Sequence, residues 1–233
     1  MAKSKNKSSR FWYYLKRIFI VLFVAQFIYI IILRWVNPPI TITQAVSYFR
    51  GNGLNRDYIA YENMGSNAKL AILAGEDQQF PDHNGFDIKA IKLAMKYNKK
   101  HPTKIRGAST LSQQVAKNVF LWQHGGYFRK GLEVYFTFMI ETFWGKERIL
   151  EMYLNVAEMG KGVFGIEAAS QSYFNKDAKS LGKMEAAQIG AALPNPVRFT
   201  IKPQSKYVAI RSVFIAGQMT NISDDEDIKA LIK

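Results

Sequence analysis

One uncharged stretch constrains the fold of this chain more than any other feature. Residues 18–33, IFIVLFVAQFIYIIIL, lack charged side chains, aromatic residues lie on both sides, and Lys and Arg crowd the segment before them. A membrane-spanning helix needs about 20 apolar residues and favours aromatic side chains at both interfaces. We therefore predict a transmembrane helix over residues 15–36, with the basic segment 1–14 in the cytoplasm and the remaining chain outside.

The residues after this stretch indicate that the helix is retained. No small-residue cleavage site follows the apolar run, and Asn37-Pro38-Pro39 is typical of a stiff exit linker. This pattern predicts an uncleaved signal anchor rather than a removed signal peptide. The alternative, a buried core helix, is disfavoured by the basic flank and by the flanking aromatic residues.

The net charge and the absence of cysteine limit which partners and which kinds of catalysis are expected. The formal net charge is +14, which favours an anionic partner. The basic N-terminal segment needs only anionic lipid headgroups to explain it, so we do not predict nucleic acid as a partner. The chain has no Cys, which excludes disulfides and thiol catalysis, and its three His residues lack the spacing of zinc ligands.

Beyond a connector over residues 37–66, the patterns are helical and show no strand alternation, so the chain is predicted to be all-α. A helix signal covers 43–50, an amphipathic run begins at Asp87, and Thr110 and Gln113 have capping-box spacing. Further helices are expected over 146–155, 166–174, 184–193 and 208–219, with a short terminal helix after the acidic residues 224–227.

Two adjacent carboxylates, Glu76 and Asp77, follow an apolar helical run and precede the breakers Pro81 and Gly85. A carboxylate placed where a packed helix ends can have its pKa raised by apolar neighbours, as a general acid or base requires. For an isolated Glu-Asp pair, a solvated helix end is the more common explanation.

Farther along the chain, residues 113–118 form a polar helix face, and Glu133 is a second candidate acid. Gln113 and Lys117, like Gln114 and Asn118, are four residues apart, on a different face from the apolar stripe. Such a face can hold sugar hydroxyls and phosphate, although taken alone it is more often an ordinary solvated helix face. Glu133 lies in an aromatic stretch whose residues 134–140 are too short to span a membrane; they are either core or a surface that dips into the outer leaflet.

Four blocks stand in order: EDQQFPDHNGFD, RGASTLSQQVAKN, RKGLEVYFTFMIE and KERILEMYLNVAEMGKGVFGIEAASQSYF. Together they resemble the peptidoglycan glycosyltransferases of glycosyltransferase family 51, in particular the monofunctional, membrane-anchored members. The resemblance covers residues 67–220 and leaves 221–233 as a C-terminal tail. It implies an all-α, lysozyme-like glycosyltransferase domain with a small membrane-associated jaw, preceded by one N-terminal transmembrane helix.

The resemblance also implies an activity and a location. Enzymes of this family elongate glycan chains from lipid II, form β-1,4 bonds with inversion and release undecaprenyl pyrophosphate; no transpeptidase activity is expected here. The implied partners are lipid II, the growing lipid-linked glycan, membrane lipids and other cell-wall synthesis proteins. The implied location is the bacterial inner membrane, with the catalytic domain in the periplasm.

Residue roles follow from the same resemblance. Glu76 matches the catalytic base, and Glu133 matches a second glutamate that assists departure of the pyrophosphate. No cofactor is required, although a divalent cation (Mg or Mn) could assist. The implied substrate-binding residues are Asp77, Ser109, Thr110, Gln113, Gln114, Lys117, Asn118, Arg129, Lys130 and Arg148. The implied structural residues are Phe80, His83, Gly85, Asp87, Gly107, Tyr153 and Asn155.

The chain departs from the family pattern at two places. Gln79 stands where many members have a basic residue, and Gly125-Gly126 stand where many have Arg-Ser. A phosphate-contacting arginine is therefore missing, and we expect His124, Arg129 or the loop backbone to take over part of its role.

Two other functions compete with polymerisation. A lytic, lysozyme-like glycosidase would also use a glutamate after a helix, but would cleave finished glycan. A catalytically silent scaffold would tether cell-wall machinery at the membrane. The membrane anchor and the Lys/Gln face favour the polymerase over the lytic enzyme, and the presence of both glutamates disfavours the scaffold.

Overall fold

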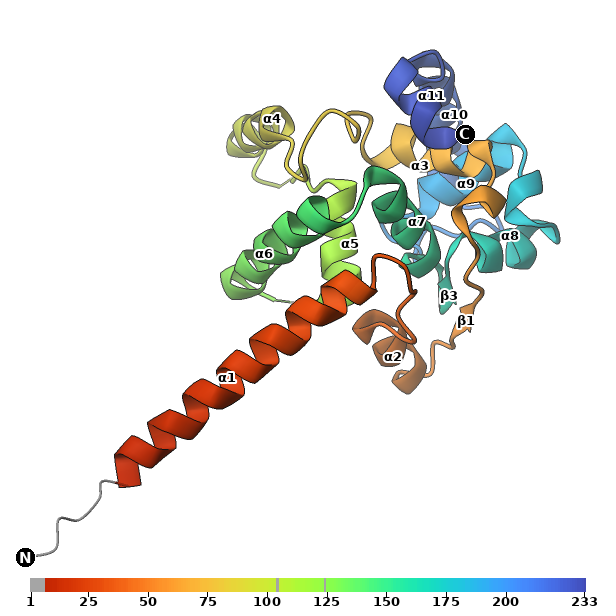
Figure 1. The fold of residues 1–233 in the computed structure, drawn as a ribbon. Coiled ribbons are helices and arrows are strands. Elements are labelled where there is room, and N and C mark those ends of the chain that lie inside the picture. The colour runs from red at the N-terminus through yellow and green to blue at the C-terminus, as the bar shows by residue number, and fades with distance from the viewer. Residues whose placement is uncertain (1–6, 104, 124) are drawn as a thin grey trace, which may run out of the picture. The chain divides into compact units, whose positions relative to one another are not determined.

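The computed structural model describes residues 7–103, 105–123 and 125–233 (Figure 1). The chain forms two compact units, residues 1–37 and residues 38–233. The first unit contains the helix α1, Lys7–Ile32. Its segment Arg10–Ile32 is the one helix in the described part of the chain that is long and apolar enough to cross a membrane.

The second unit is mostly helical, which confirms the predicted all-α class. Its α-helices are α2 (Ile42–Phe49), α3 (Ser66–Glu76), α4 (Ile88–Lys100), α5 (Leu111–Phe120), α6 (Tyr127–Phe143), α7 (Lys146–Val156), α8 (Ile166–Phe174), α9 (Lys183–Ala192), α10 (Lys206–Ile222) and α11 (Glu226–Ile232). Two short 3-10 turns lie at Tyr61–Asn63 and Ala178–Ser180.

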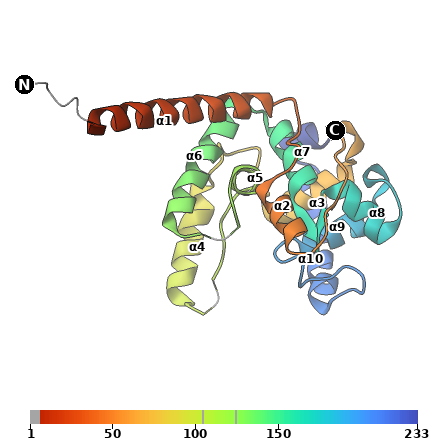
Figure 2. The same cartoon turned by 90° about the horizontal axis from the view of Figure 1, so that it is seen from below.

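Helices α3, α9 and α10 pack together into one half of the core (Figure 2). Small residues on α9 permit this close approach, because a Cβ at Gly190 would lie 3.3 Å from the carbonyl oxygen of Ala71 on α3. A Cβ at Gly75 would similarly meet Ile215 Cδ1 of α10 at 3.1 Å. The apolar run of α3 is thereby buried, and its last residue, Glu76, lies at the edge of this core.

Helix α5 organises the other half by packing against α6 and α7. Its predicted apolar stripe, Leu111, Val115 and Val119, is buried. The rings of Phe120 and Phe136 stack with centroids 4.6 Å apart and fix α5 on α6. Of its polar residues, Gln114, Lys117 and Asn118 line cavities beside this core.

The structure also contains three short strands that the sequence pattern did not predict. They are β1 (Asn55–Arg56), β2 (Glu158–Gly160) and β3 (Val163–Phe164), in the order β1-β3-β2. Strands of two or three residues are too short to show alternation, which explains the miss. Asn155 fastens the same region: it accepts a hydrogen bond from Ile59 N and donates one to Ile59 O, each at 3.0 Å.

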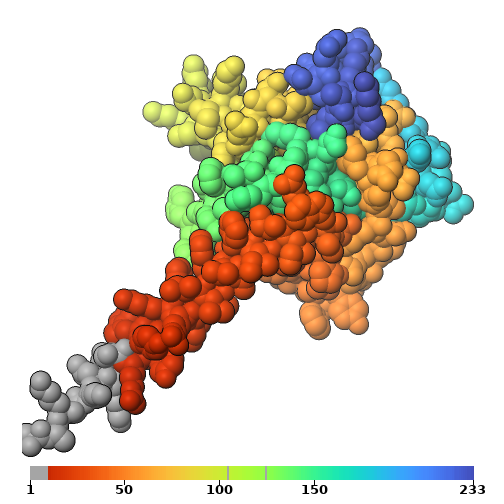
Figure 3. Space-filling view, viewed as in Figure 1, coloured from red at the N-terminus to blue at the C-terminus, as the bar shows by residue number. Residues whose placement is uncertain are grey.

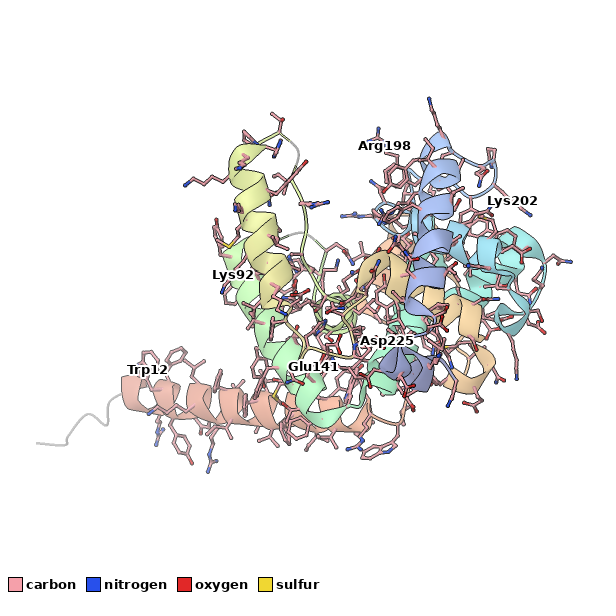
Figure 4. The ribbon with its side chains drawn as sticks, turned by 90° about the horizontal axis from the view of Figure 1, so that it is seen from above. Trp12, Lys92, Glu141, Arg198, Lys202 and Asp225 are labelled. Carbon is pink, nitrogen blue, oxygen red and sulfur yellow. The ribbon has the colours of Figure 1, made fainter. Side chains whose placement is uncertain are left out.

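Helix α4 forms as predicted, but its apolar residues do not make a buried stripe. Ile88, Leu93 and Met95 are 55%, 66% and 67% exposed. In both ribbon views α4 lies apart from the α3–α9–α10 bundle (Figures 1 and 2), and it projects from the surface in the space-filling view (Figure 3). Its lysines, including Lys92 labelled in Figure 4, are exposed as well. This helix therefore presents apolar and basic side chains to its surroundings.

Candidate active site

Glu76 lies at the end of a chain of hydrogen bonds that connects three helices. Its Oε2 accepts a hydrogen bond from Gln114 Nε2 of α5 at 2.7 Å. Gln114 Oε1 in turn accepts one from the hydroxyl of Tyr153, which is buried on α7, at 3.3 Å. Tyr153, predicted as a structural residue, therefore helps to orient the carboxylate.

A cavity of about 700 Å³ opens beside Glu76. The loop before α5 contributes Gly107 and Ser109 to its lining. Asp87 at the start of α4, Gln114 of α5 and Arg211 line it as well. The volume falls in the range of about 300–1,000 Å³ that is typical of ligand sites. A sugar hydroxyl entering this cavity can therefore reach the Glu76 carboxylate.

The surroundings of Glu76 suit a general base. Burial raises the pKa of the Glu76 carboxyl above its ordinary value; the Gln114 hydrogen bond and the charges of Arg211 and Lys117 lower it, and Asp77 adds a small increase. Burial is the largest of these effects, so the carboxyl binds a proton more readily than a solvated glutamate does.

Arg211 is a site residue that the sequence analysis missed. It lies on α10, lines the Glu76 cavity, and its Nη2 donates to Gly75 O at 3.3 Å. A signal was present, because Arg211 is three residues after Val208 and four before Ile215, both buried. A lone arginine on the packed side of an apolar helix indicates a specific partner.

Asp77 joins the loop after α3 to the start of α5. Its carboxylate oxygens lie 3.0 and 3.1 Å from His83 Nε2, and Oδ2 accepts a hydrogen bond from Leu111 N at 2.9 Å. His83 Nδ1 accepts one from Gly85 N at 3.1 Å. Asp77 and His83 thus hold the backbone around Glu76, which is a positioning role.

Thr110 and Gln113 form the capping box predicted from their spacing. Thr110 Oγ1 accepts from Gln113 N, and Gln113 Oε1 accepts from Thr110 N. Thr110 also donates to Gly85 O at 2.7 Å. Both side chains are buried in these contacts. They therefore start α5 and fix the neighbouring loop.

The loop after Glu76 is held from α6 and α7 as well. Glu141, labelled in Figure 4, accepts hydrogen bonds from Ser112 and from Lys146. The ammonium of Lys146 lies 4.5 Å from the centre of the buried Phe80 ring. Asp87 ends the loop by capping α4, accepting from Ala90 N at 2.8 Å. Glu141 and Lys146 were not identified from the sequence.

Gly85 has a conformation and surroundings that require glycine. Its φ is +85°, and an added Cβ would lie 2.7 Å from Thr137 Cγ2 and 2.9 Å from Glu141 Cγ. We expect Gly85→Ala to lower the free energy of unfolding by about 1–3 kcal/mol, because backbone strain and a steric clash act together. Urea unfolding of the solubilised chain measures this change.

Gly131→Ala is the matched control for that substitution. Gly131 lies inside α6, and an added Cβ would meet no atom within 4 Å. Alanine there should leave stability unchanged or raise it by about 0.5–1 kcal/mol. Equal unfolding midpoints for the two variants would contradict the requirement for glycine at position 85.

Glu133 is buried on α6 and is paired with two basic residues. Glu133 Oε2 accepts a hydrogen bond from Arg129 Nη1 at 2.7 Å, and Oε1 accepts one from Lys130 Nζ. These pairs are one helical turn apart and lie on one face of α6. Glu133 therefore holds two cations in fixed positions.

Lys117 connects the two glutamates electrostatically. Burial lowers the pKa of the Lys117 ammonium; Glu133 and Glu76 raise it, whereas Arg129 and Lys130 lower it. Lys117 lines a second cavity of about 170 Å³, together with Gln114, Asn118 and Tyr153. Gln114 and Pro194 line both cavities, so the two are adjacent.

One hydrogen-bond donor of Arg129 is not used within the described part of the chain. Its Nε is buried and has no hydrogen-bond partner in the described part of the chain. A Cβ at Gly125 would lie 3.1 Å from this atom and 2.8 Å from Arg129 Cβ, so the glycine leaves room for the arginine. His124, the other predicted substitute for the missing arginine, lies outside the described residues. An unpaired buried N–H is a ready site for an anion.

Arg148 and Asn118 are not among the described residues that line the Glu76 cavity. Arg148 is on α7, where its Nη1 donates to Glu151 at 2.8 Å, and it is not among the described residues that line the two cavities. Asn118 Oδ1 accepts from Gln123 Nε2 at 3.1 Å at the edge of the Lys117 cavity.

Comparison with known proteins shows clear similarity. The sequence model of a family described as Transglycosylase matches residues 43–220. A biosynthetic peptidoglycan transglycosylase of Pseudomonas entomophila (strain L48) is 49% identical over 199 residues, which cover 83% of this chain and 84% of the relative. Proteins with the same description from Bdellovibrio bacteriovorus and Pseudomonas aeruginosa are each 45% identical; the matches cover 90% and 87% of this chain, and 85% and 89% of those proteins. The family model covers every residue that lines the two cavities and all of α2 except Ile42.

Proposed function

This chain belongs to the transglycosylase family, and we propose that it polymerises peptidoglycan from lipid II, forming β-1,4 bonds with inversion and releasing undecaprenyl pyrophosphate. The observation that carries this proposal is the half-buried Glu76, held by Gln114 and adjacent to the cavity of Lys117. A base and a cationic site side by side are what this transfer reaction needs.

Glu76 is proposed to act on the acceptor sugar. Its carboxylate takes the proton from the 4-hydroxyl, while that oxygen forms a bond to the anomeric carbon of the donor. The bond from this carbon to the pyrophosphate oxygen breaks, and its electron pair leaves with the pyrophosphate. Attack from the opposite face inverts the anomeric centre, as in inverting glycosidases with a sugar hydroxyl in place of water. Tyr153 and Gln114 keep the carboxylate oriented.

The pyrophosphate is proposed to be bound by side-chain cations. Lys117 lines the cavity next to Glu76, and the unpaired Nε of Arg129 offers a further donor. Preorganised cations stabilise charge that develops on the leaving group. Glu133 fixes Arg129 and Lys130 and thereby orients this cationic group.

A divalent cation does not fit this group well. The carboxylate in the group of Arg129, Lys130 and Glu133 belongs to Glu133. Both of its oxygens already accept hydrogen bonds from Arg129 and Lys130. Adding a dication beside these cations would cost electrostatic energy. The proposed chemistry therefore passes through the side-chain cations and through no metal.

The location is part of the same proposal. Helix α1 would anchor the chain in the bacterial inner membrane, with the N-terminus in the cytoplasm and residues 38–233 in the periplasm. The exposed apolar side chains of α4 would contact the outer leaflet, where the lipid-linked substrates reside. Membrane lipids and other cell-wall synthesis proteins are the proposed partners besides lipid II.

The raised pKa of Glu76 predicts the pH dependence of the reaction. A base must be deprotonated to act, and a raised pKa keeps Glu76 protonated to a higher pH than an ordinary glutamate, whose value is 4.5. The acid limb of kcat/KM should therefore have its midpoint above 4.5, with activity lost as the pH falls through that midpoint. Initial rates with labelled lipid II over a pH series measure this limb.

A substitution of Arg211, whose charge acts on Glu76, tests whether the acid limb belongs to Glu76. Arg211→Gln removes a cation that lowers the pKa of Glu76, so its acid limb should move to higher pH than that of the wild-type chain. A limb that stays in place, or that moves to lower pH, would contradict the assignment of this limb to Glu76.

A further inference from the structure

A buried lysine lies on α3, about two helical turns before the proposed base. Lys69 is 2% exposed, and it precedes Glu76 by seven residues. The two residues therefore lie about 10 Å apart along the helix axis and on nearly the same face. Burying an ammonium group is costly unless it is paired, so a lysine is retained at such a position only with specific partners. The reaction proposed above does not use Lys69.

The partners of Lys69 come from α11 and from the 3-10 turn Tyr61–Asn63. Its Nζ donates a hydrogen bond to Lys233 O at 2.9 Å and lies 3.5 Å from the centre of the Tyr61 ring. The Tyr61 hydroxyl in turn donates a hydrogen bond to Leu231 O. The last carbonyl groups of a helix lack partners within it, and here two side chains from outside α11 bind carbonyl groups at its end.

Apolar contacts and a helix cap hold α11 on the core. Ile228 and Leu231 are 2% and 6% exposed, and α11 packs against α3 (Figure 1). Asp225, labelled in Figure 4, begins the helix, because its side chain accepts hydrogen bonds from Asp227 N and Ile228 N, each at 3.0 Å. This helix lies beyond residue 220, where the match to the transglycosylase family ends.

Helix α11 also borders the loop that follows Glu76. A cavity of about 480 Å³ lies between one face of α11, Pro81 in this loop and the start of α7. Lys146 lines the cavity, and its ammonium donates a hydrogen bond to His83 O in the same loop. Helix α11 therefore adjoins both segments that place Glu76, namely α3 before it and the loop after it.

We propose that Lys69 is a positioning residue for Glu76 and that α11 holds Lys69 in place. This inference rests on the proposed polymerase function and adds to it a helix outside the two active-site cavities. Helix α3 ends at Glu76, so a shift of α3 against α5 would weaken the 2.7 Å hydrogen bond from Gln114 to Glu76. A small displacement of a catalytic group can lower the rate by about 10²-fold. The bond from Lys69 to α11 opposes such a shift.

Lys69→Met and Leu231→Asn test the proposal in the full-length chain. Met has a similar volume but cannot bind Lys233 O, and Asn removes an apolar anchor of α11. We expect each substitution to lower kcat with lipid II about tenfold and to leave KM nearly unchanged. The acid limb of kcat/KM should move to higher pH, because the Gln114 hydrogen bond lowers the pKa of Glu76 and would be weakened.

Two matched variants serve as controls. Lys229→Gln changes an exposed residue of the same helix, and Leu231→Met keeps the apolar anchor, so both should behave as the wild-type chain does. The charged groups that act on Glu76 are unchanged in all four variants: Asp77, Lys117 and Arg211. A shifted acid limb therefore reports a change in the position of Glu76.

Two outcomes, measured below the melting temperature of each variant, would overturn the proposal. Wild-type kcat in Lys69→Met and Leu231→Asn would mean that α11 does not position Glu76. A lower kcat with the acid limb in place would mean that α11 stabilises the fold without positioning the base. Failure of the polymerase function is distinct, since the wild-type chain would then form no polymer. Hydrogen exchange of residues 77–87, expected to be faster in both variants, would still test the contact of α11 with the loop.

Discussion

Replacing Glu76 by Gln is expected to lower the rate of glycan polymerisation by about 10²–10⁴-fold, the range of a general base. Gln keeps the size of the side chain and can still form a hydrogen bond with Gln114, but it cannot take a proton from the acceptor hydroxyl. The loss should therefore fall on kcat, while binding of lipid II changes little. Initial rates and lipid II affinity, measured on the solubilised full-length chain, give both quantities.

Stability separates this chemical effect from unfolding. A raised pKa means that the ionised carboxylate is unfavourable in the folded state, since burial disfavours its charge. The Gln variant should thus melt at the same temperature as the wild-type chain or higher, at a pH where the carboxyl is ionised. A variant that keeps wild-type activity would remove Glu76 from the role of base.

Replacing Lys117 by Met should be nearly as damaging, with an expected loss of about 10²–10³-fold in kcat/KM. Met fills a similar volume but removes the charge from the cavity beside Glu76. The developing charge on the pyrophosphate would lose its nearest cation, so both donor affinity and the transfer step should weaken. Single-turnover rates over a range of donor concentrations separate the two contributions.

Lys117→Arg and Lys161→Met are the controls for that loss. Arg keeps the positive charge and should retain part of the activity. Lys161 is exposed in the turn between β2 and β3, so its substitution changes the net charge equally without touching the cavities. If Lys161→Met were as damaging as Lys117→Met, the effect would reflect overall charge and not pyrophosphate binding.

Local patterns allowed much of the helical fold to be predicted from the sequence. The capping box of Thr110 and Gln113 and the apolar stripe of α5 both depend on residues three or four positions apart. The helices α7 and α8 were likewise predicted close to their observed bounds, Lys146–Val156 and Ile166–Phe174. These patterns can be recognised in the sequence because the interacting residues belong to the same helix, three or four positions apart.

Contacts between distant segments could not be predicted in the same way. Strand β1 pairs with β3, more than a hundred residues later, and each has only two residues. Arg211 reaches Gly75 from α10, a pairing that no local pattern encodes. The three-helix chain of hydrogen bonds from Tyr153 to Glu76 also depends on how the core packs.

The polar residues of α5 show where the sequence reasoning reached its limit. Gln113 and Gln114 were both expected to contact substrate, but Gln113 is buried in the helix cap whereas Gln114 holds Glu76. Adjacent helical residues point about 100° apart, so only packing decides which of them faces a cavity. Lys117 and Asn118 both line the second cavity, at different depths of burial.

Incubation of the solubilised full-length chain with labelled lipid II, with product lengths resolved on a gel, tests the polymerase function most directly. We predict long glycan products from the wild-type chain, their loss in the presence of the inhibitor moenomycin, and almost none from the Glu76→Gln variant. The same preparations incubated with finished glycan should leave it intact. No polymer from lipid II together with cleavage of finished glycan would contradict the account and identify a lytic enzyme.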